Sequence, residues 1–205
     1  MEIEIKFCIS RSNQLLPVIP DPDAYVKLFE GKQLAEFFAG NVPDIFEFQK
    51  DDYLSQPGRD LKSLDEVFRK REITTYIRRK SKWQIKEHDQ LLTWKGPAER
   101  GVVKSREEIE FSTPDSLWVV LGKIGFNSSL IICKHRWVFK IRSKDQTFNL
   151  CFDCVEKLGC FIEIELITSN ENKEKAIDAI FDLQKELGWE NFSVEKRSYA
   201  QLIKE

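Results

Sequence analysis

Acidic and basic side chains recur at every second position in several separated segments of this 205-residue chain. In the first segment, Glu2, Glu4 and Lys6 alternate with apolar residues. Alternation with a period of two places all charges of a β-strand on one face. The later segments add the charged positions Arg106, Glu108, Glu110, Lys134, Arg136, Glu163 and Glu165. Grouped carboxylates could hold Mg²⁺ or Mn²⁺, and the Lys and Arg side chains could bind the phosphates of a polyphosphate.

Two arrangements of these strands fit the alternation. In the first, each charged face contacts water, as is usual for a sheet that buries one side. In the second, the sheet curls into a barrel with its charged faces inward and its apolar faces packed outward against helices. Burying so much charge is costly unless a ligand compensates it. The second arrangement therefore predicts a bound polyanion accompanied by divalent cations, and alternation alone leaves both open.

Charge and composition exclude several classes of protein. The chain has 32 Lys and Arg against 34 Asp and Glu, and this absence of a basic excess argues against non-specific binding to nucleic acid or to a membrane surface. Hydrophobic residues make up 41% of the chain and include 15 Phe, which excludes disorder and allows a large core. The chain has no internal repeat and no linker rich in Gly or Ser, so we expect one α+β domain over residues 1–205.

The five cysteines favour reduced thiols over a disulfide framework, because their number is odd and the N-terminus does not resemble a secretory signal. Cys151 and Cys154 have the spacing of a zinc or redox pair. They have no second such pair, however, and they lie in an apolar alternating stretch, which favours buried thiols on a strand. No apolar run approaches the ~18 residues of a membrane span. We therefore expect a cytoplasmic protein.

Helical spacing of apolar residues predicts helices over residues 22–38 and 170–187. Thr-Pro-Asp at residues 113–115 is a helix-start signal and predicts a third helix, ending before Gly125. Ser63 and Glu66 have the spacing of a capping box, which predicts a further helix over residues 64–71. Shorter strands are expected over residues 74–80, 91–95 and 147–155. The Pro-containing segment before Asp52 is expected to be a surface excursion.

Eight segments, in order along the chain, resemble motifs of the CYTH family, also called triphosphate tunnel metalloenzymes. The first is EIEIK at residues 2–6, which matches the ExExK signature of that family. The others are DYLSQPGRDL at 52–61, DEVFRKR at 65–71, LTWKGP at 92–97, SREEIE at 105–110, KHR at 134–136, Asp153 with GCFIEIE at 159–165, and RSYAQL at 197–202. The last of these is similar to the tail of the class IV adenylate cyclase branch.

This resemblance implies an antiparallel β-barrel of about eight strands, with an open charged tunnel and flanking helices. It implies that the metal, Mg²⁺ or Mn²⁺, is held by Glu2, Glu4, Asp153, Glu163 and Glu165. It implies that the triphosphate is bound by Lys6, Arg69, Arg71, Lys95, Arg106, Lys134 and Arg136. Glu108 and Glu110 would either ligate a metal or orient the neighbouring basic side chains. Together with Lys6, they are the candidate catalytic residues.

A second basic segment, at residues 76–80, leaves an alternative for two of these positions. If residues 64–72 formed a helix, Arg78 and Lys80 would replace Arg69 and Arg71 as the inward-facing pair. We favour Arg69 and Arg71, because their spacing from Tyr53 fits the motif.

The resemblance implies a cyclase that converts ATP to cyclic AMP and pyrophosphate. A triphosphatase acting on thiamine triphosphate or inorganic triphosphate is the alternative, and a non-catalytic module that binds triphosphate or polyphosphate is the third possibility. No histidine is an evident general base, because His88 lies in a polar, exposed segment, expected to be a turn, and His135 falls on an apolar face. Lys6, a carboxylate or a metal-bound hydroxide could serve instead. A homodimer is the default expectation for assembly.

Overall fold

The computed structural model describes residues 2–11, 29, 32–41, 43, 45–79, 82–99, 101 and 103–203. Within these residues, nine strands form one sheet in which every neighbouring pair is antiparallel. The strands are β1 (Glu2–Arg11), β2 (Ile45–Ser55), β3 (Val67–Arg79), β4 (Lys82–Lys95), β5 (Lys104–Arg106), β6 (Glu108–Ser112), β7 (Asn127–Ser143), β8 (Gln146–Val155) and β9 (Gly159–Ile167). Their order across the sheet is β5-β1-β9-β8-β7-β2-β3-β4-β6.

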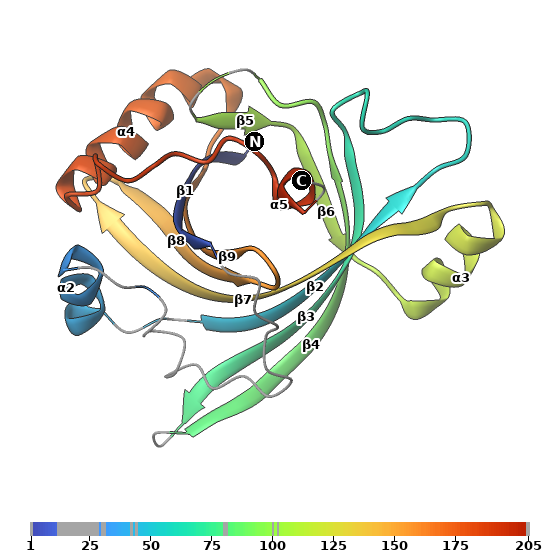
Figure 1. Ribbon diagram of the computed structural model, residues 1–205, viewed down its shortest axis with the longest axis horizontal. Helices are drawn as coiled ribbons and strands as arrows, with labels where there is room; N and C mark the ends of the chain where they lie inside the picture. The colour runs from blue at the N-terminus through green and yellow to red at the C-terminus, as the bar shows by residue number, and fades with distance from the viewer. Residues whose placement is uncertain are drawn as a thin grey trace.

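The sheet closes on itself through the residues around Glu107. β5 pairs with β1 at one edge of the sheet, β6 pairs with β4 at the other, and only Glu107 separates β5 from β6 in sequence. The stretch 104–112 therefore joins the two edges and produces the nearly closed barrel of Figure 1. Counted as one interrupted strand, this stretch gives the antiparallel barrel of about eight strands with flanking helices that the resemblance to the CYTH family implies.

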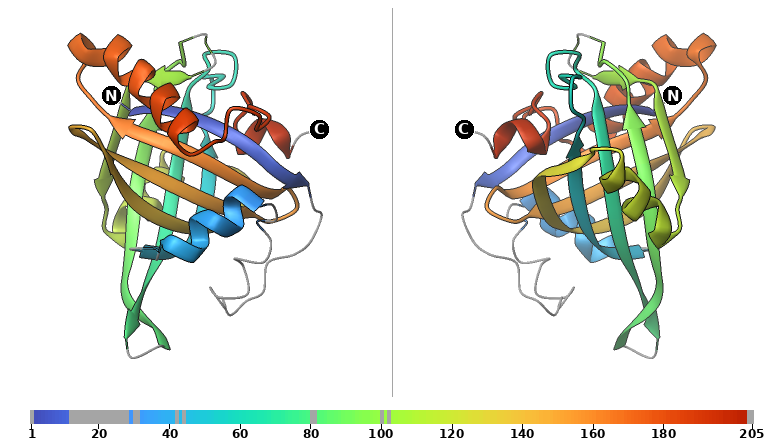
Figure 2. Two further views of the ribbon diagram at one scale, coloured as in Figure 1. Left: turned by 90° about the vertical axis from the view of Figure 1, so that its left-hand side faces the viewer. Right: turned by 90° about the vertical axis from the view of Figure 1, so that its right-hand side faces the viewer.

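The apolar face of the strands points outward and is covered by two helices. Helices α2 (Lys32–Gly40) and α4 (Lys173–Glu186) lie over the side of the barrel formed by β1, β9, β8 and β7 (Figure 2). Phe37 of α2 stacks on Phe152 of β8 with ring centroids 5.3 Å apart, and Ile180 of α4 is fully buried in the same core. Each such side chain stabilises the fold by roughly 2 kcal/mol, so this outer layer lets the barrel keep a polar interior.

Three of the predicted helices are present, with shifted ends. The helix predicted over 22–38 is described as α2 from Lys32, and residues 22–28 lie outside the described residues, as does most of the predicted surface excursion before Asp52. The helix after Thr113 is α3 (Asp115–Lys123). The helix predicted over 170–187 is a 3₁₀ turn, Asn170–Asn172, followed by α4. A short helix that was not expected, α5 (Tyr199–Leu202), lies at one opening of the barrel (Figure 1).

The helix predicted over residues 64–71 is wrong. Asp60 organises this region as a turn, because its Oδ1 accepts hydrogen bonds from the backbone N–H groups of Lys62 and Ser63 at 3.1 and 3.2 Å. Asp65 has a φ of 54°, which ends the turn, and β3 begins two residues later. Ser63 therefore does not cap a helix. Arg69 lies on a strand between two pairing partners, and its neighbour across β2 is Tyr53.

None of the helices that the structure describes has the length and apolar character required to cross a membrane.

Candidate active site

The inward face of the barrel surrounds a highly charged cavity of about 200 Å³. Eight basic and six acidic side chains line it among the described residues. The basic ones are Lys6, Arg69, Arg71, Lys95, Lys104, Arg106, Lys134 and Arg136, and the acidic ones are Glu2, Glu4, Glu108, Glu110, Glu163 and Glu165. Tyr53, Ser198 and Tyr199 complete the lining. Of the two arrangements that alternation left open, the structure therefore shows the inward one.

Asp51 holds two of the basic side chains in place. It lies opposite Arg71 in the register of β2 and β3, and its Oδ1 and Oδ2 accept hydrogen bonds from Arg71 Nε and Nη2 at 2.6 and 2.8 Å. Arg69 Nη1 donates to the same Oδ2 at 3.0 Å. Burial opposes ionisation of Asp51, but the charges of Arg69 and Arg71 outweigh it and hold the pKa of this carboxyl well below its usual range. Both guanidinium groups are thus fixed before any ligand arrives.

Asp153 plays the same part on β8, which is separated from β2 by β7 alone. It is completely buried, and its carboxylate accepts two hydrogen bonds from Arg136 at 2.7 Å each and one from Lys134 Nζ at 3.0 Å. The hydroxyl of Tyr199 donates a further one at 2.9 Å. Burial alone would raise the pKa of Asp153. The charges of Arg136 and Lys134 lower it by more than burial raises it, so the net shift is downward and the carboxylate stays ionised. With its oxygens occupied in this way, Asp153 lies beneath the cavity as a support for the basic side chains.

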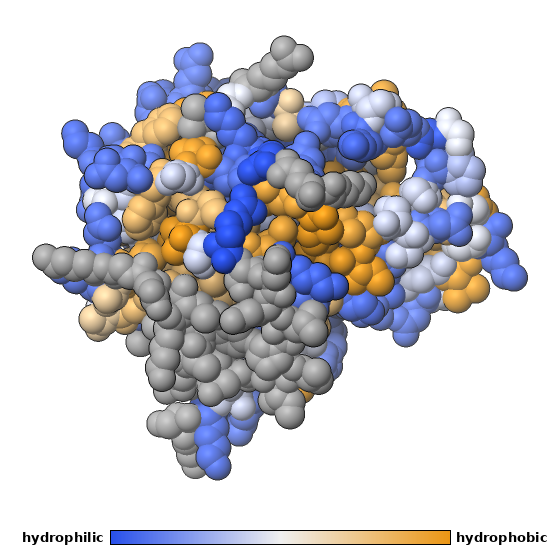
Figure 3. All heavy atoms as spheres, viewed as in Figure 1, coloured by the Kyte–Doolittle hydropathy of each residue, from blue (hydrophilic) through white to orange (hydrophobic). Residues whose placement is uncertain are grey.

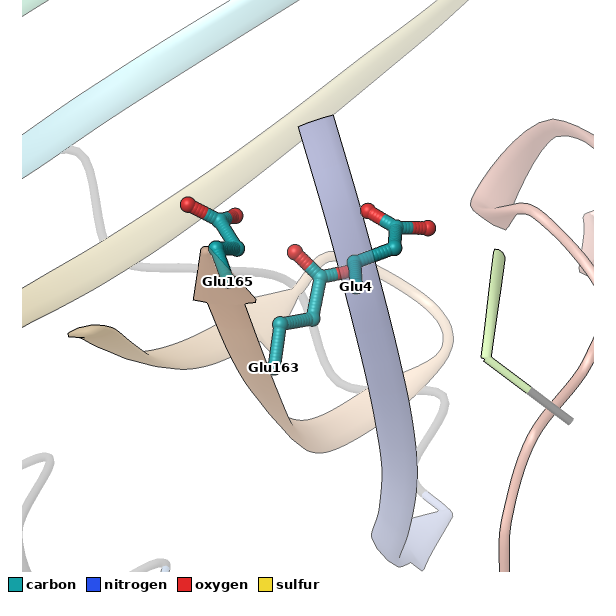
Figure 4. A group of neighbouring side chains, drawn as sticks. All are labelled: Glu4, Glu163 and Glu165. Carbon is teal, nitrogen blue, oxygen red and sulfur yellow. The ribbon is translucent and has the colours of Figure 1, made fainter. Parts of the chain in front are cut away.

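Three carboxylates gather on the wall formed by β1 and β9. Oxygen atoms of Glu4, Glu163 and Glu165 lie within 4.8 Å of one another, and the three side chains project from these two neighbouring strands (Figure 4). Glu4 and Glu165 are direct partners in the β1–β9 register. Like charges in directly opposite positions destabilise a sheet, so this placement favours a cation between them.

Basic residues approach this cluster from three sides. Arg136 forms ion pairs with both Glu163 and Glu165, the second at 2.9 Å, and Lys104 Nζ lies 3.5 Å from Glu4. Lys6 Nζ is 4.0 Å from Glu163. The cluster therefore combines hard oxygen donors, which suit Mg²⁺ or Mn²⁺, with cationic groups that could bind phosphate oxygens.

The protonation equilibria of the cluster are strongly perturbed. Burial raises the pKa of Glu165 to about 7; the charge of Arg136 opposes this rise, and the charges of Glu2, Glu163 and Glu4 add to it. Burial also raises the pKa of Glu163, but Arg136, Lys134 and Lys6 reverse this and hold it well below its usual range. Burial lowers the pKa of Lys6 to about 8. A buried, crowded set of charges of this kind is typical of a functional site.

Glu2, Glu108 and Glu110 lie away from this cluster and contact basic side chains. Lys95 Nζ is 2.6 Å from Glu108 and 3.2 Å from Glu2. Glu110 accepts a hydrogen bond from Thr93 at 2.6 Å and lies 3.9 Å from Arg69 Nη2. Of the two roles left open for Glu108 and Glu110, the geometry favours orienting the neighbouring bases.

The structure brings together all but one of the predicted site residues. Only Asp153 is not a lining residue, and neither it nor Glu2 belongs to the carboxylate cluster. Arg69 and Arg71 line the cavity, whereas the side chain of Arg78, and Lys80 altogether, lie outside what the structure describes. Sequence reasoning missed Asp51, Lys104 and Tyr199. Asp51 lies two residues before Tyr53, and Lys104 lies two residues before Arg106, so alternation could have placed both on inward faces.

Tyr199 could not have been found from periodicity, because it lies on α5, far along the chain from the strands that it contacts. Its ring lies under two of the cavity's ammonium groups, with Lys6 Nζ 4.4 Å and Lys134 Nζ 5.3 Å from the ring centroid. A cation over an aromatic face is stabilised electrostatically. Tyr199 therefore shares Lys134 with Asp153 and contacts Lys6 as well.

Cys151, Cys154 and His135 are buried, as predicted. Cys151 and Cys154 are buried on β8, and their spacing of three residues points them to opposite faces of the strand, so they cannot share one metal ion. His135 is fully buried and stacks on Phe46 with ring centroids 5.6 Å apart. His88 is exposed, but it lies within β4, and the turn predicted there is absent.

Comparison with known families agrees with this geometry. The family description of the CYTH domain matches residues 1–199. A protein of Methanocaldococcus jannaschii that bears the name "putative adenylate cyclase" is 28% identical over 159 residues, which cover 76% of this chain and 81% of that protein.

Solved structures show the same barrel. The PH1819 protein of Pyrococcus horikoshii is 25% identical and superposes with a TM-score of 0.71, covering 99% of this chain and 98% of its own. A protein of Hippeastrum, described as a "putative adenylyl cyclase" with a dominant triphosphatase activity, has a TM-score of 0.56 at 18% identity and covers 100% of this chain and 95% of its own. At that identity the second likeness shows the fold alone.

Proposed function

The chain belongs to the CYTH family, and from this premise we propose that it is a metal-dependent enzyme that converts ATP to cyclic AMP and pyrophosphate in the charged cavity. The observation that carries the proposal is the juxtaposition, in one enclosed space, of the Glu4–Glu163–Glu165 cluster with basic side chains held by Asp51 and Asp153. Pure anion binding would not require the three clustered carboxylates. The name of the Methanocaldococcus jannaschii relative supports the cyclase reaction.

The basic side chains would bind the triphosphate. Buried aspartates already orient Arg69 and Arg71 on β3 and Lys134 and Arg136 on β7, so little reorganisation accompanies binding. Electrostatic groups that are fixed in advance in a water-poor site contribute most to phosphoryl chemistry. Lys95, held by Glu2 and Glu108, extends this positive surface toward β4 and β6.

The carboxylate cluster fits a divalent cation of the Mg²⁺ or Mn²⁺ type, since its donors are hard oxygens that crowd one another. Glu4, Glu163 and Glu165 are the residues that would hold it. When bound, such an ion neutralises charge on the phosphate oxygens and on the leaving group.

The chain's own groups would then orient the reaction and move its proton. In cyclisation the ribose 3′-oxygen attacks the α-phosphorus, the bond from that phosphorus to the bridging oxygen breaks, and pyrophosphate leaves. Lys6 Nζ or a cavity carboxylate would accept the 3′-hydroxyl proton, since these groups line the cavity. Arg136, which contacts Glu163 and Glu165 as well as Asp153, couples the phosphate-binding wall to the cluster.

A triphosphatase is the second candidate, favoured by the activity described for the Hippeastrum protein. Here water attacks the terminal phosphorus of ATP, thiamine triphosphate or inorganic triphosphate, and the bond from that phosphorus to the bridging oxygen breaks. The corresponding diphosphate leaves, and the terminal phosphoryl group becomes orthophosphate. The same basic groups would bind the triphosphate, because the two reactions differ only in the phosphorus attacked and in the nucleophile.

Phosphorus NMR separates these activities. The protein is incubated with ATP, thiamine triphosphate or inorganic triphosphate in the presence of Mg²⁺ or Mn²⁺. Parallel samples contain excess chelator in place of the metal ion. Cyclic AMP with pyrophosphate supports the cyclase, and orthophosphate supports the triphosphatase. Binding of the triphosphates without turnover would contradict both reactions and leave a binding module.

A further inference from the structure

Two buried thiols face each other outside the charged cavity. Cys154 of β8 and Cys160 of β9 are direct partners in the register of these strands, and their Sγ atoms lie 3.2 Å apart. The spacing along the chain singles out Cys151 and Cys154, whereas strand pairing brings Cys154 to Cys160. We call Cys154 and Cys160 the thiol pair.

The register of the two strands allows a disulfide at this position. Directly opposite residues of an antiparallel pair have Cα atoms about 4.5–5.5 Å apart, which lies within the range of about 4.4–6.8 Å found for disulfides. The sulfur atoms, now 3.2 Å apart, would have to approach to a bond length of about 2.05 Å. Side-chain rotation is sufficient for a shift of this size, so the strands need not separate.

In the described strand pairs, no other cysteine has a thiol opposite it. The partners on the neighbouring strands are Phe161 for Cys8, Lys50 for Cys133, and Val138 and Glu163 for Cys151. All five cysteines lie among the described residues and are free thiols. We therefore expect the thiol pair to be the position at which an intrachain disulfide forms.

The thiol pair belongs to the outer core of the barrel. Both side chains are buried in the apolar cluster that includes Phe37 of α2 and Ile180 of α4, and neither lines the charged cavity. Cys154 is 2% exposed and Cys160 is 4% exposed. A small, uncharged oxidant such as hydrogen peroxide is therefore better suited to reach these thiols than a bulky or charged one.

The hairpin that carries the thiol pair lies beside α5. Asp153, the buried support of the basic side chains, precedes Cys154 on β8 and pairs with Phe161 on β9. At the turn of the hairpin, Leu158 shares a buried cluster with Leu202 of α5. In Figure 3, which has the viewpoint of Figure 1, hydrophobic side chains gather beside the position of α5 at the barrel opening. A bond between the thiols would brace the strands next to this opening.

We propose that the thiol pair is a site of reversible oxidation, at which hydrogen peroxide joins Cys154 to Cys160 in a disulfide that braces the β8–β9 hairpin. One thiolate attacks a peroxide oxygen, the O–O bond breaks, and the released hydroxide takes up the proton of that thiol to give water. The opposing thiolate then attacks the sulfur of the sulfenic acid, the S–O bond breaks, and the released hydroxide takes up the second thiol proton. Two thiols and one peroxide thus give one disulfide and two waters.

Peptide mapping of the wild-type protein tests the site. The protein is treated with a small excess of hydrogen peroxide, its remaining thiols are alkylated, and it is denatured and digested with trypsin without reduction. Cleavage after Lys157 separates the two cysteines. The disulfide should therefore appear in the mass spectrum as a cross-linked pair of peptides, residues 145–157 and 158–173, that dithiothreitol separates.

Serine variants assign the bond to its two sulfur atoms. Cys151 lies in the same peptide as Cys154, so Cys151→Ser is the matched control: it removes a buried thiol of β8 and should keep the cross-link. Cys154→Ser and Cys160→Ser should each abolish it. If a variant fails to fold, fragment ions of the wild-type cross-linked peptides identify the bonded cysteine directly.

The bond should also raise the thermal midpoint, because it restricts the unfolded chain. For a short closed loop in a chain of this length, we expect the oxidised protein to melt about 5 °C above the same sample reduced again with dithiothreitol. A cross-link through Cys151, a cross-link only between chains, or oxidation of the thiols without a cross-link would overturn the proposal. An unchanged thermal midpoint in the cross-linked protein would overturn the bracing role.

Discussion

Asp51 and Arg71 face each other across β2 and β3 and are joined by two parallel hydrogen bonds inside the barrel, at 2.6 and 2.8 Å. The pair makes the basic wall of the cavity rigid, because the guanidinium plane cannot rotate without losing both bonds. Arg69 shares the same carboxylate. One buried acid thus positions two groups proposed to bind phosphate.

We expect Asp51→Asn to lower the free energy of unfolding by about 3 kcal/mol, because buried Arg71 loses its charged hydrogen-bond partner and Arg69 keeps only Glu110 at 3.9 Å. Affinity for inorganic triphosphate should also change, since Arg69 and Arg71 lose their fixed orientation. Urea unfolding and calorimetry measure the two effects. Asp52→Asn, on the opposite face of the same strand, is the control; equal losses in both variants would contradict the role of Asp51.

Replacement of the clustered carboxylates should remove the metal dependence. We expect Glu4→Gln and Glu163→Gln to reduce turnover at least about 100-fold, because each deletes a charged oxygen donor from the proposed site. Mg²⁺ or Mn²⁺ should raise the thermal midpoint of the wild-type protein and not of the variants. Glu174→Gln, on the exposed face of α4, is the matched control. Turnover at the wild-type rate in either cluster variant would contradict the metal assignment.

Because His135 is buried, the free energy of unfolding should decrease in acid. Burial lowers its pKa from 6.5 to about 4, so below pH 6.5 the unfolded chain binds a proton that the folded protein does not. Its contribution to stability is complete above pH 6.5 and is lost as the pH falls toward 4, by about 1.4 kcal/mol per pH unit and about 3 kcal/mol in all.

Glu165 changes the free energy of unfolding with pH in the opposite direction over part of this range, because burial raises its pKa. The effect of His135 is therefore measured by comparing the wild type with a His135 variant. Urea unfolding at several pH values should show that His135→Phe lacks the decrease in unfolding free energy in acid that is attributed to His135. His88→Phe, which replaces the exposed histidine, should still show that decrease. An identical pH dependence in the wild type and His135→Phe would contradict the assignment.

Tyr199 should contribute through both its hydroxyl and its ring. We expect Tyr199→Phe to lower the free energy of unfolding by about 1.5 kcal/mol, because buried Asp153 loses one of its donors but keeps Arg136 and Lys134. Tyr199→Leu also removes the ring beneath Lys6, so it should weaken triphosphate binding more than Tyr199→Phe does. Equal triphosphate affinities in the two variants would show that the ring has no role in binding.

Much of the cavity lining could be predicted because alternate residues of a β-strand lie on the same face. Glu2, Glu4 and Lys6 must lie on one side of β1 whatever the strand packs against, and the same holds for Glu163 and Glu165 on β9. The resemblance to the CYTH family then indicated that these sides face inward. The helix predicted over 64–71 failed because a local capping pattern was outweighed by pairing of β3 with two neighbouring strands.

By itself, the sequence determined which side chains share a face and which family the chain resembles, because both follow from order and spacing along the chain. Only the tertiary structure decided which charges meet. Asp153 supports Lys134, Arg136 and Tyr199 and stays apart from the carboxylate cluster, because strand register and the docking of α5 bring those groups to it. Glu4 meets Glu165 through the pairing of the first and last strands, and distances across a barrel are not encoded in local periodicity.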